Sequence, residues 1–152
     1  VSRRLTCTVF MPSRRWSSVA NANKRKGDAA ERKVRDYAQG RYTGSFKTRA
    51  GFNDDLGDVI ANHPGGHVVL QVKDVAKPTW AAWFEQLAGQ VSTCARESQR
   101  FVLGGVIVHK ARGVGDPAKW RAVAELSTVL DLIDAAYEAG VDHGHRSARG
   151  LE

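Results

Sequence analysis

Long apolar runs and a cysteine framework are both missing from this sequence. No apolar stretch approaches the roughly 18 residues that a membrane-spanning helix needs, and no basic segment leads into the hydrophobic region of a signal peptide. The two cysteines, Cys7 and Cys94, stand in unrelated contexts, which argues against a disulfide framework or a metal-binding pair. We therefore expect an intracellular, cytoplasmic protein with no membrane partner.

Acidic residues are missing from the first 27 positions, where basic residues are frequent. Seven basic residues precede Asp28, and the 16 that follow match the 16 acidic residues, so the net charge of +7 arises in the first 26 positions. We predict that residues 1–24 form a basic, flexible arm suited to an anionic partner, nucleic acid above all. The alternatives are a solvated tail, sequence upstream of a start at Met11, or a transit peptide.

The remaining chain has the length and the hydrophobic content, 42%, of one domain with its own core. Apolar residues at helical spacing predict a helix over 28–40, in which Asp28 and Glu31 would form an N-terminal capping box. A strand over 41–50 and a turn-rich loop follow, and we assign Asp54 and Asp55 to that loop.

The stretch from His67 to Lys73 combines a buried strand with polar side chains. Its β-branched run predicts a central strand, and alternation places His67, Gln71 and Lys73 on one face. A Pro-Gly-Gly turn joins it to a short strand that begins at Asp58, which predicts a hairpin. In an antiparallel hairpin Asp58 comes next to Gln71 and Lys73, and His67 would lie at the edge of that cluster.

The second half of the chain alternates helix and strand patterns. A helix over 80–97 carries an aromatic stripe that we assign to the core, and its other face carries Glu85, Gln86 and Gln90. A buried strand over 101–108 contains two glycines, which indicate a bulge or a close backbone approach. A strand over 120–126, a helix capped by Ser127 and a disordered tail over 142–152 complete the chain. This order predicts a three-layer α/β domain over 25–141, with a mixed central sheet flanked by helices.

The polar cluster at the hairpin suits phosphodiester hydrolysis. That reaction needs an activated water and neutralisation of charge on phosphorus, and a divalent ion held by oxygen ligands supplies both. Asp58, the Gln71 amide oxygen and the Val72 carbonyl oxygen provide such ligands, and Glu31 is a further carboxylate. Lys73 can orient the water and offset negative charge. Taken singly, these residues have ordinary alternatives: a strand cap for Asp58, a helix cap for Glu31 and a solvated strand end for Lys73.

Three short motifs in this order resemble the PD-(D/E)XK nuclease superfamily, with its αβββαβ restriction-endonuclease-like core. The closer similarity is to archaeal-type Holliday junction resolvases. Residues 26–32 (KGDAAER) resemble their K-G-x-x-x-E-R, residues 57–61 (GDVIA) resemble P-D-I-I-A, and residues 71–73 (QVK) resemble E-V-K. The resemblance covers about residues 24–108.

The resemblance implies a metal-dependent, structure-specific endonuclease that makes paired nicks in four-way or other branched DNA as a homodimer. It implies a nuclease-like domain over 25–141 that uses Mg²⁺, with Mn²⁺ as a substitute. Glu31, Asp58 and Gln71 would be metal ligands and Lys73 the catalytic lysine. Arg49 would sit near the scissile phosphate, and we assign Arg25, Lys26 and Lys47 to DNA contact as well.

The sequence departs from that pattern at Gln71, which replaces an acid, and at Gly57, which replaces a proline. The first change leaves three interpretations: a working variant with Glu31 compensating, an altered metal preference, or a fold kept for binding alone. We expect the working variant because Asp58 and Lys73 are both present. Another restriction-like or repair nuclease of the same fold, or a non-catalytic nucleic-acid-binding module, are the alternative functions.

Overall fold

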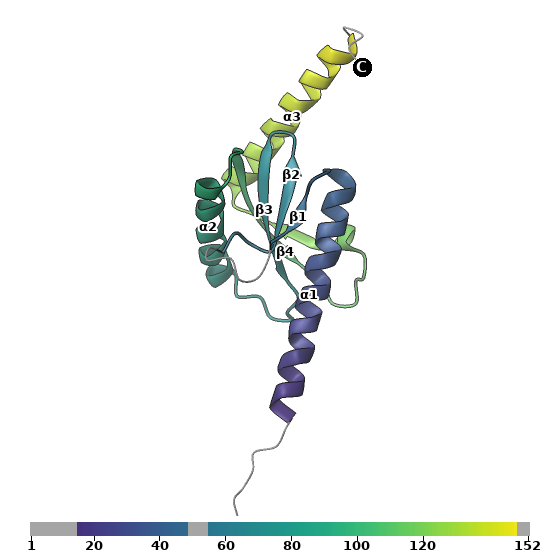
Figure 1. The fold of residues 1–152 in the computed structure, drawn as a ribbon, viewed down its shortest axis with the longest axis vertical. Coiled ribbons are helices and arrows are strands. Elements are labelled where there is room, and N and C mark those ends of the chain that lie inside the picture. Colours follow the sequence, from purple (N-terminus) through teal and green to yellow (C-terminus); the bar gives the residue numbers. More distant parts are fainter. Residues whose placement is uncertain (1–14, 49–54, 149–152) are drawn as a thin grey trace, which may run out of the picture.

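A five-stranded mixed sheet forms the centre of the molecule, with helices on both faces (Figure 1). The computed structural model describes residues 15–48 and 55–148, and the side chains of residues 21–48 and 55–141. The strands are in sequence order, and only β3 and β4 are parallel. The strands are β1 (Phe46–Lys47), β2 (Val59–His63), β3 (Gly66–Lys73), β4 (Val102–His109) and β5 (Arg121–Val123). The helices are α1 (Arg15–Arg41), α2 (Trp80–Glu97), the short 3₁₀ turn η1 (Pro117–Lys119) and α3 (Leu126–Ala148).

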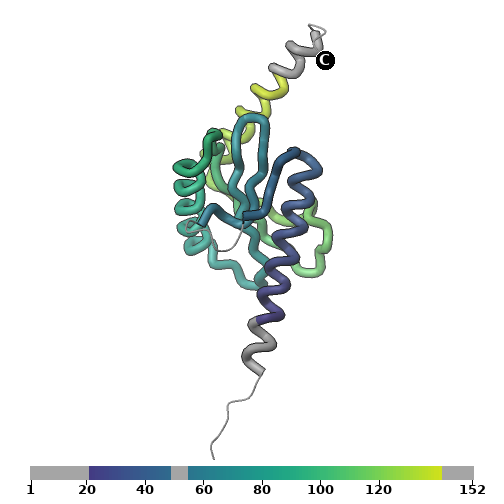
Figure 2. Tube along the Cα trace, viewed as in Figure 1, coloured from purple at the N-terminus to yellow at the C-terminus, as the bar shows by residue number. Residues whose placement is uncertain are grey.

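The two faces of the sheet have separate cores. Figure 2 shows α1 and α2 on opposite sides of the sheet, because alternate strand residues carry apolar side chains to each face. Val69 packs toward α2 with Trp83 and Leu87, whereas Val68 packs with Ala38 of α1 and Ala135 of α3. The α/β architecture, the mixed sheet and the core position of the aromatic stripe are therefore confirmed.

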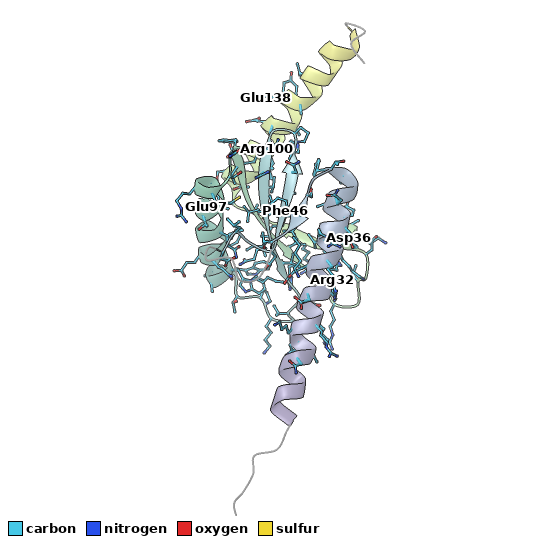
Figure 3. The ribbon with its side chains drawn as sticks, in the orientation of Figure 1. Arg32, Asp36, Phe46, Glu97, Arg100 and Glu138 are labelled. Atoms are coloured by element: carbon cyan, nitrogen blue, oxygen red, sulfur yellow. The ribbon has the colours of Figure 1, made fainter. Side chains whose placement is uncertain are left out.

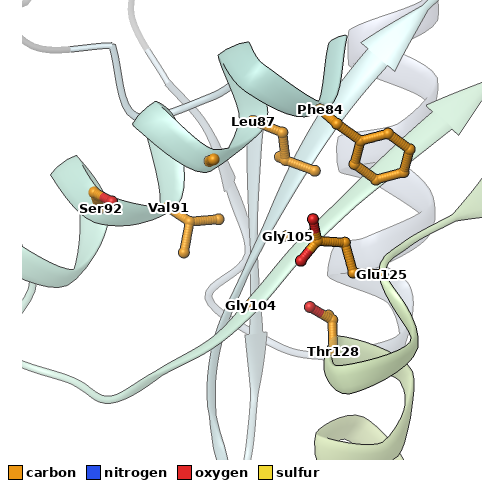
Figure 4. A pocket seen from close by; sticks show the side chains of 9 residues that line it. Phe84, Leu87, Val91, Ser92, Gly104, Gly105, Glu125 and Thr128 are labelled. Carbon is orange, nitrogen blue, oxygen red and sulfur yellow. The ribbon is translucent and has the colours of Figure 1, made fainter. Parts of the chain in front are cut away.

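Helix α2 approaches β4 closely because Gly105 has no side chain. A Cβ atom there would lie 2.7 Å from side-chain atoms of Leu87 and Val91. The β3–β4 register shifts between His67 and Val68, so that the β4 residue before Gly104 has no partner in β3. Both explanations expected for the two glycines, bulge and close approach, are confirmed. Figure 4 shows these glycines at the base of a pocket of about 260 Å³ between α2 and the start of α3.

The first helix is longer than expected. It begins at Arg15 and continues through Gly27 and Asp28 without a break, so the prediction that residues 15–24 form an arm without fixed fold was wrong. The capping box of Asp28 and Glu31 was wrong for the same reason, since a residue inside a helix has no free N-terminus to cap. The early turns contain Ala, Lys and Arg, which favour helix without any apolar stripe. Figure 1 shows them extending beyond the sheet. Residues 1–14 lie outside the described residues.

Two further boundaries differ from expectation. Within the described part of the strand predicted over 41–50, only Phe46–Lys47 is strand, because α1 runs to Arg41 and a turn follows. Residues 49 and 50 of that prediction lie outside the described residues. The tail predicted to be disordered from 142 is helical to Ala148, as the continuation of α3. That helix begins at Leu126, so Ser127 is its second residue and not its cap. No helix in the described part of the chain is both long and apolar enough to cross a membrane.

Candidate active site at the end of the β2–β3 hairpin

The hairpin brings Asp58 beside the end of β3, as the sequence predicted. Val59 pairs with Leu70, and the Asp58 backbone N–H donates to the Leu70 carbonyl oxygen at 3.1 Å. The Asp58 carboxylate also accepts a hydrogen bond of 2.6 Å from the Val72 backbone N–H. One side-chain oxygen is thereby fixed against the strand that carries Gln71 and Lys73.

The Asp58 carboxyl is held in an environment that opposes its charge. Burial raises its pKa from 3.8 to about 6, and the negative charges of Glu31 and Asp55 act in the same direction. The Val72 N–H and Lys73 favour the charged form but only partly offset this effect. Among the described residues Asp58 forms no ion pair, and the one hydrogen bond that its carboxylate accepts there comes from the Val72 N–H.

Lys73 is positioned by polar and aromatic side chains. Its Nζ donates to Gln86 Oε1 at 3.1 Å and lies 5.8 Å from the centre of the Trp83 ring. Gln71 is fully buried beside it. The Gln71 amide finds partners for both of its groups when its nitrogen faces the Trp83 carbonyl oxygen at 3.1 Å and its oxygen faces Lys73 Nζ at 3.3 Å, and we assign it in that orientation. This arrangement fixes the direction of the lysine.

Glu31 reaches the site from α1 but already has a cationic partner. Its carboxylate forms an ion pair of 2.5 Å with Lys47, which is also 3.5 Å from Asp28. Burial lowers the pKa of Lys47, but hydrogen bonds and charges of Glu31 and Asp28 outweigh burial and raise it overall. Lys47, which we assigned to DNA contact, thus lies between two acids at the border of the site.

Asp55, which we assigned to a turn, lies in the site. Its Oδ2 accepts a hydrogen bond of 2.9 Å from Gln90 Nε2 and lies 3.5 Å from Gln86 Nε2. Partial burial would raise its pKa, but the bonds from Gln90, Gly57 and Gln86 and the charge of Lys73 lower it overall. Gln86 therefore links Asp55 to Lys73. The placement of Gln90 away from the core was wrong, because Gln90 is only 2% exposed.

A signal for this network was present in the sequence. Gln86 and Gln90 are four residues apart on one helix, where they share a face, and Asp55 is three residues before Asp58. What the sequence could not show is that α2 turns that face toward the loop.

The other predicted residues are more scattered. Arg25 and Lys26 are exposed on α1, and Arg49 lies outside the described residues. His67 is at the opposite end of β3 from Lys73, where its Nδ1 is 3.0 Å from Ser98 Oγ. The expectation that His67 borders the cluster was therefore wrong. Figure 3 shows Arg100 near the turn between β2 and β3, where its side chain donates to the carbonyl oxygens of His63 and Pro64.

Gly57 explains one departure from the resolvase pattern. Its φ is +92°, and an added Cβ would lie 2.6 Å from Val69 Cγ1. Proline cannot adopt this φ, since its ring holds φ near −65°. The backbone before Asp58 therefore suits glycine and excludes proline.

The carboxylate and amide oxygens of the site are the types of donor that suit a hard divalent cation. Carboxylate and amide oxygens are the ligands that Mg²⁺ and Mn²⁺ prefer, and Asp58 carries charge that no side chain within the described ranges neutralises in an ion pair. Within those ranges, no three His, Cys, Asp or Glu side chains are grouped closely enough to hold a metal ion by themselves. A bound ion would thus depend on Asp58, with water and substrate oxygens completing its coordination.

Comparisons with protein-family models, curated proteins and solved structures found no match to this chain.

Proposed function

We propose that this protein is a metal-dependent DNA endonuclease that acts on branched DNA, with the four-way junction as its principal substrate and a homodimer as its active form. One observation carries the proposal. Asp58, a half-buried carboxylate without an ion-pair partner among the described residues, lies at the same strand end as Lys73, a lysine that neighbouring side chains hold in a fixed direction. The element order α1–β1–β2–β3–α2–β4 agrees with the αβββαβ order of the PD-(D/E)XK nucleases that the motifs resemble.

The roles follow from the contacts. The Val72 N–H fixes one oxygen of Asp58, so the carboxylate can present its other oxygen to a cation. Mg²⁺ bound there would lower the pKa of a water molecule and offset charge on the phosphate. Lys73 would orient that water and stabilise the negative charge that develops on the phosphate oxygens.

Gln71 and Asp55 would act around this pair. Gln71 is buried and has its oxygen near Lys73 Nζ, so in this proposal it positions the lysine. Asp55 would supply negative charge that the position of Gln71 lacks, since it acts electrostatically on Asp58. Glu31 would also supply negative charge once its partner Lys47 moves toward the DNA, because the DNA phosphates compete with Glu31 for that lysine.

A second candidate function is DNA binding without cleavage. Two observations favour it: Gln71 stands where the related motif has an acid, and Glu31 is neutralised by Lys47 at 2.5 Å. A third possibility is a nuclease of the same fold with another substrate, because loops and dimer geometry, rather than the fold, select the DNA.

One experiment separates these functions. Labelled four-way junction, flap and linear duplex are each incubated with the protein in Mg²⁺, Mn²⁺ or EDTA, alongside Asp58→Asn and the exposed control Asp131→Asn. Paired symmetric nicks in the junction alone, lost in Asp58→Asn and kept in Asp131→Asn, are expected. Cutting of all three substrates would indicate a general nuclease, and binding without metal-dependent cutting would exclude the endonuclease.

A further inference from the structure

A basic cleft adjoins the candidate site. It has a volume of about 690 Å³ and lies between α1, the segment after β3, the end of β4 and the start of β5. Four basic side chains line it, against a single acid, Asp74. The basic residues are Lys26, Lys110, Arg112 and Arg121. A concave surface with this excess of positive charge attracts anions.

Most of that charge is not neutralised by acids in the described part of the protein. Lys110 forms an ion pair of 2.6 Å with Asp74 and lies 5.8 Å from the centre of the Trp120 ring. No ion pair engages Lys26, Arg112 or Arg121 within residues 21–48 and 55–141, and all three are exposed. Arginine and lysine in this state are available for phosphate oxygens, and arginine binds them with two parallel hydrogen bonds.

The cleft is built on the backbone of Lys73. Asp74 follows Lys73 directly, and the Lys110 N–H donates to the Lys73 carbonyl oxygen at 2.9 Å. His109 pairs with Lys73 across β3 and β4 and bonds through Nε2 to the Val75 carbonyl oxygen at 2.9 Å. These bonds fix the wall of the cleft relative to the lysine, so an anion in the cleft would be held at a constant distance from the candidate site.

We propose that this cleft binds the phosphodiester backbone of the DNA strand next to the phosphate that is cut. The proposal rests on the proposed function, because it assumes that the strand also reaches Lys73. Three cations around one cleft that pair with no acid in the described part of the chain suit a polymer with successive phosphates better than a single phosphate group. The cleft would fix the register of the strand and leave the identity of the bases unread.

Binding without metal tests this inference separately from cleavage. Fluorescence anisotropy in EDTA measures the affinity of a labelled four-way junction for the wild type and for Arg112→Gln/Arg121→Gln, at several salt concentrations. The double variant should bind roughly tenfold or more weakly, and the slope of log affinity against log salt should fall by about 1 to 2, as expected for two lost phosphate contacts. Arg41→Gln, at the far end of α1 from Lys26, is the matched control and should behave as the wild type.

Competition identifies the source of the phosphate. Inorganic phosphate and deoxyadenosine monophosphate should fail to displace the junction at micromolar concentration, because each offers only one phosphate group. Wild-type affinity and salt slope in the double variant would overturn the inference even if the protein cuts DNA, and so would displacement by the mononucleotide. If the protein never cuts DNA but the double variant loses DNA binding, the cleft would be upheld as a DNA-binding surface and the endonuclease would be rejected.

Discussion

At the scale of single residues, Asp58 determines how the candidate site responds to pH. Its pKa is raised from 3.8 to about 6, chiefly by burial, so the folded state favours the protonated carboxyl. The stability that the protonated Asp58 carboxyl contributes is fully present below about pH 3.8 and is lost as the pH rises through about 6. Near neutral pH the charged carboxylate therefore destabilises the metal-free protein.

Asp58→Asn should stabilise the metal-free protein at pH 7.5, because the amide keeps the acceptor for the Val72 N–H and removes the charge. The gain should be on the order of 1–2 kcal/mol, and it should shrink toward pH 4. Urea unfolding in EDTA at both pH values measures it, with Asp131→Asn as the control. An equal stability difference at pH 4 and pH 7.5 would show that the Asp58 charge is not the cause.

Metal binding should depend on Asp55 as well as on Asp58. Removing the charge of Asp55 lowers the negative potential at Asp58, so Asp55→Asn should weaken Mn²⁺ binding several-fold, and Asp58→Asn should abolish it. Isothermal titration calorimetry with Mn²⁺ measures both effects, and Asp116→Asn, at the residue that caps η1, is the control. Mn²⁺ affinity unchanged in Asp55→Asn would remove Asp55 from the site.

At the scale of elements, glycines show where the backbone is constrained. Gly89 lies in the middle of α2, and an added Cβ there would meet nothing within 4 Å. Gly57 has a φ of +92° and no room for a Cβ. The same substitution should therefore have opposite effects at the two positions.

Gly89→Ala should raise the free energy of unfolding by about 1 kcal/mol, because alanine is a better helix former. Gly57→Ala should lower it by more than about 1 kcal/mol, through backbone strain and the contact with Val69. Urea unfolding of the two variants measures both changes. Destabilisation by Gly89→Ala would mean that α2 packs more tightly around this position than the structure indicates.

Sequence patterns predicted the elements that have apolar periodicity and failed where helix forms without it. The β2–β3 hairpin, α2 and β4 follow from alternation and helical spacing, and so does the meeting of Asp58 with Lys73. The first turns of α1 carry no apolar stripe, and the last turns of α3 are themselves polar, so neither was predicted. Asp55 was missed because its role depends on which face α2 turns toward the loop, which is a property of packing.

At the scale of the whole molecule, α3 presents an apolar face to solvent. Exposed apolar side chains recur along one side of the helix, and six of them are between 39% and 73% exposed: Leu126, Val129, Leu130, Ile133, Tyr137 and Val141. An apolar groove of about 290 Å³ between this helix and β5 continues the patch. Exposed apolar patches of this kind are found at protein interfaces. In the proposed homodimer, a two-fold axis would bring this face onto the same face of a second copy.

Leu130→Asp/Ile133→Asp should convert the proposed dimer to a monomer, since two charges would be buried in the interface. Sedimentation equilibrium measures the mass, and circular dichroism checks that the fold is kept. Ser127→Asp/Glu138→Asp, on the same helix, is the control. A wild type that is monomeric at all concentrations would reject both the homodimer and this assignment of the α3 face.

The nuclease proposal depends most on Lys73. The most direct measurement is the single-turnover rate of junction nicking in Mg²⁺ for the wild type, Lys73→Ala and the exposed control Lys77→Ala. We expect a rate roughly 10²–10⁴-fold lower in Lys73→Ala, with unchanged junction affinity in EDTA and a wild-type rate in Lys77→Ala. Nicking by Lys73→Ala at the wild-type rate would contradict the proposal.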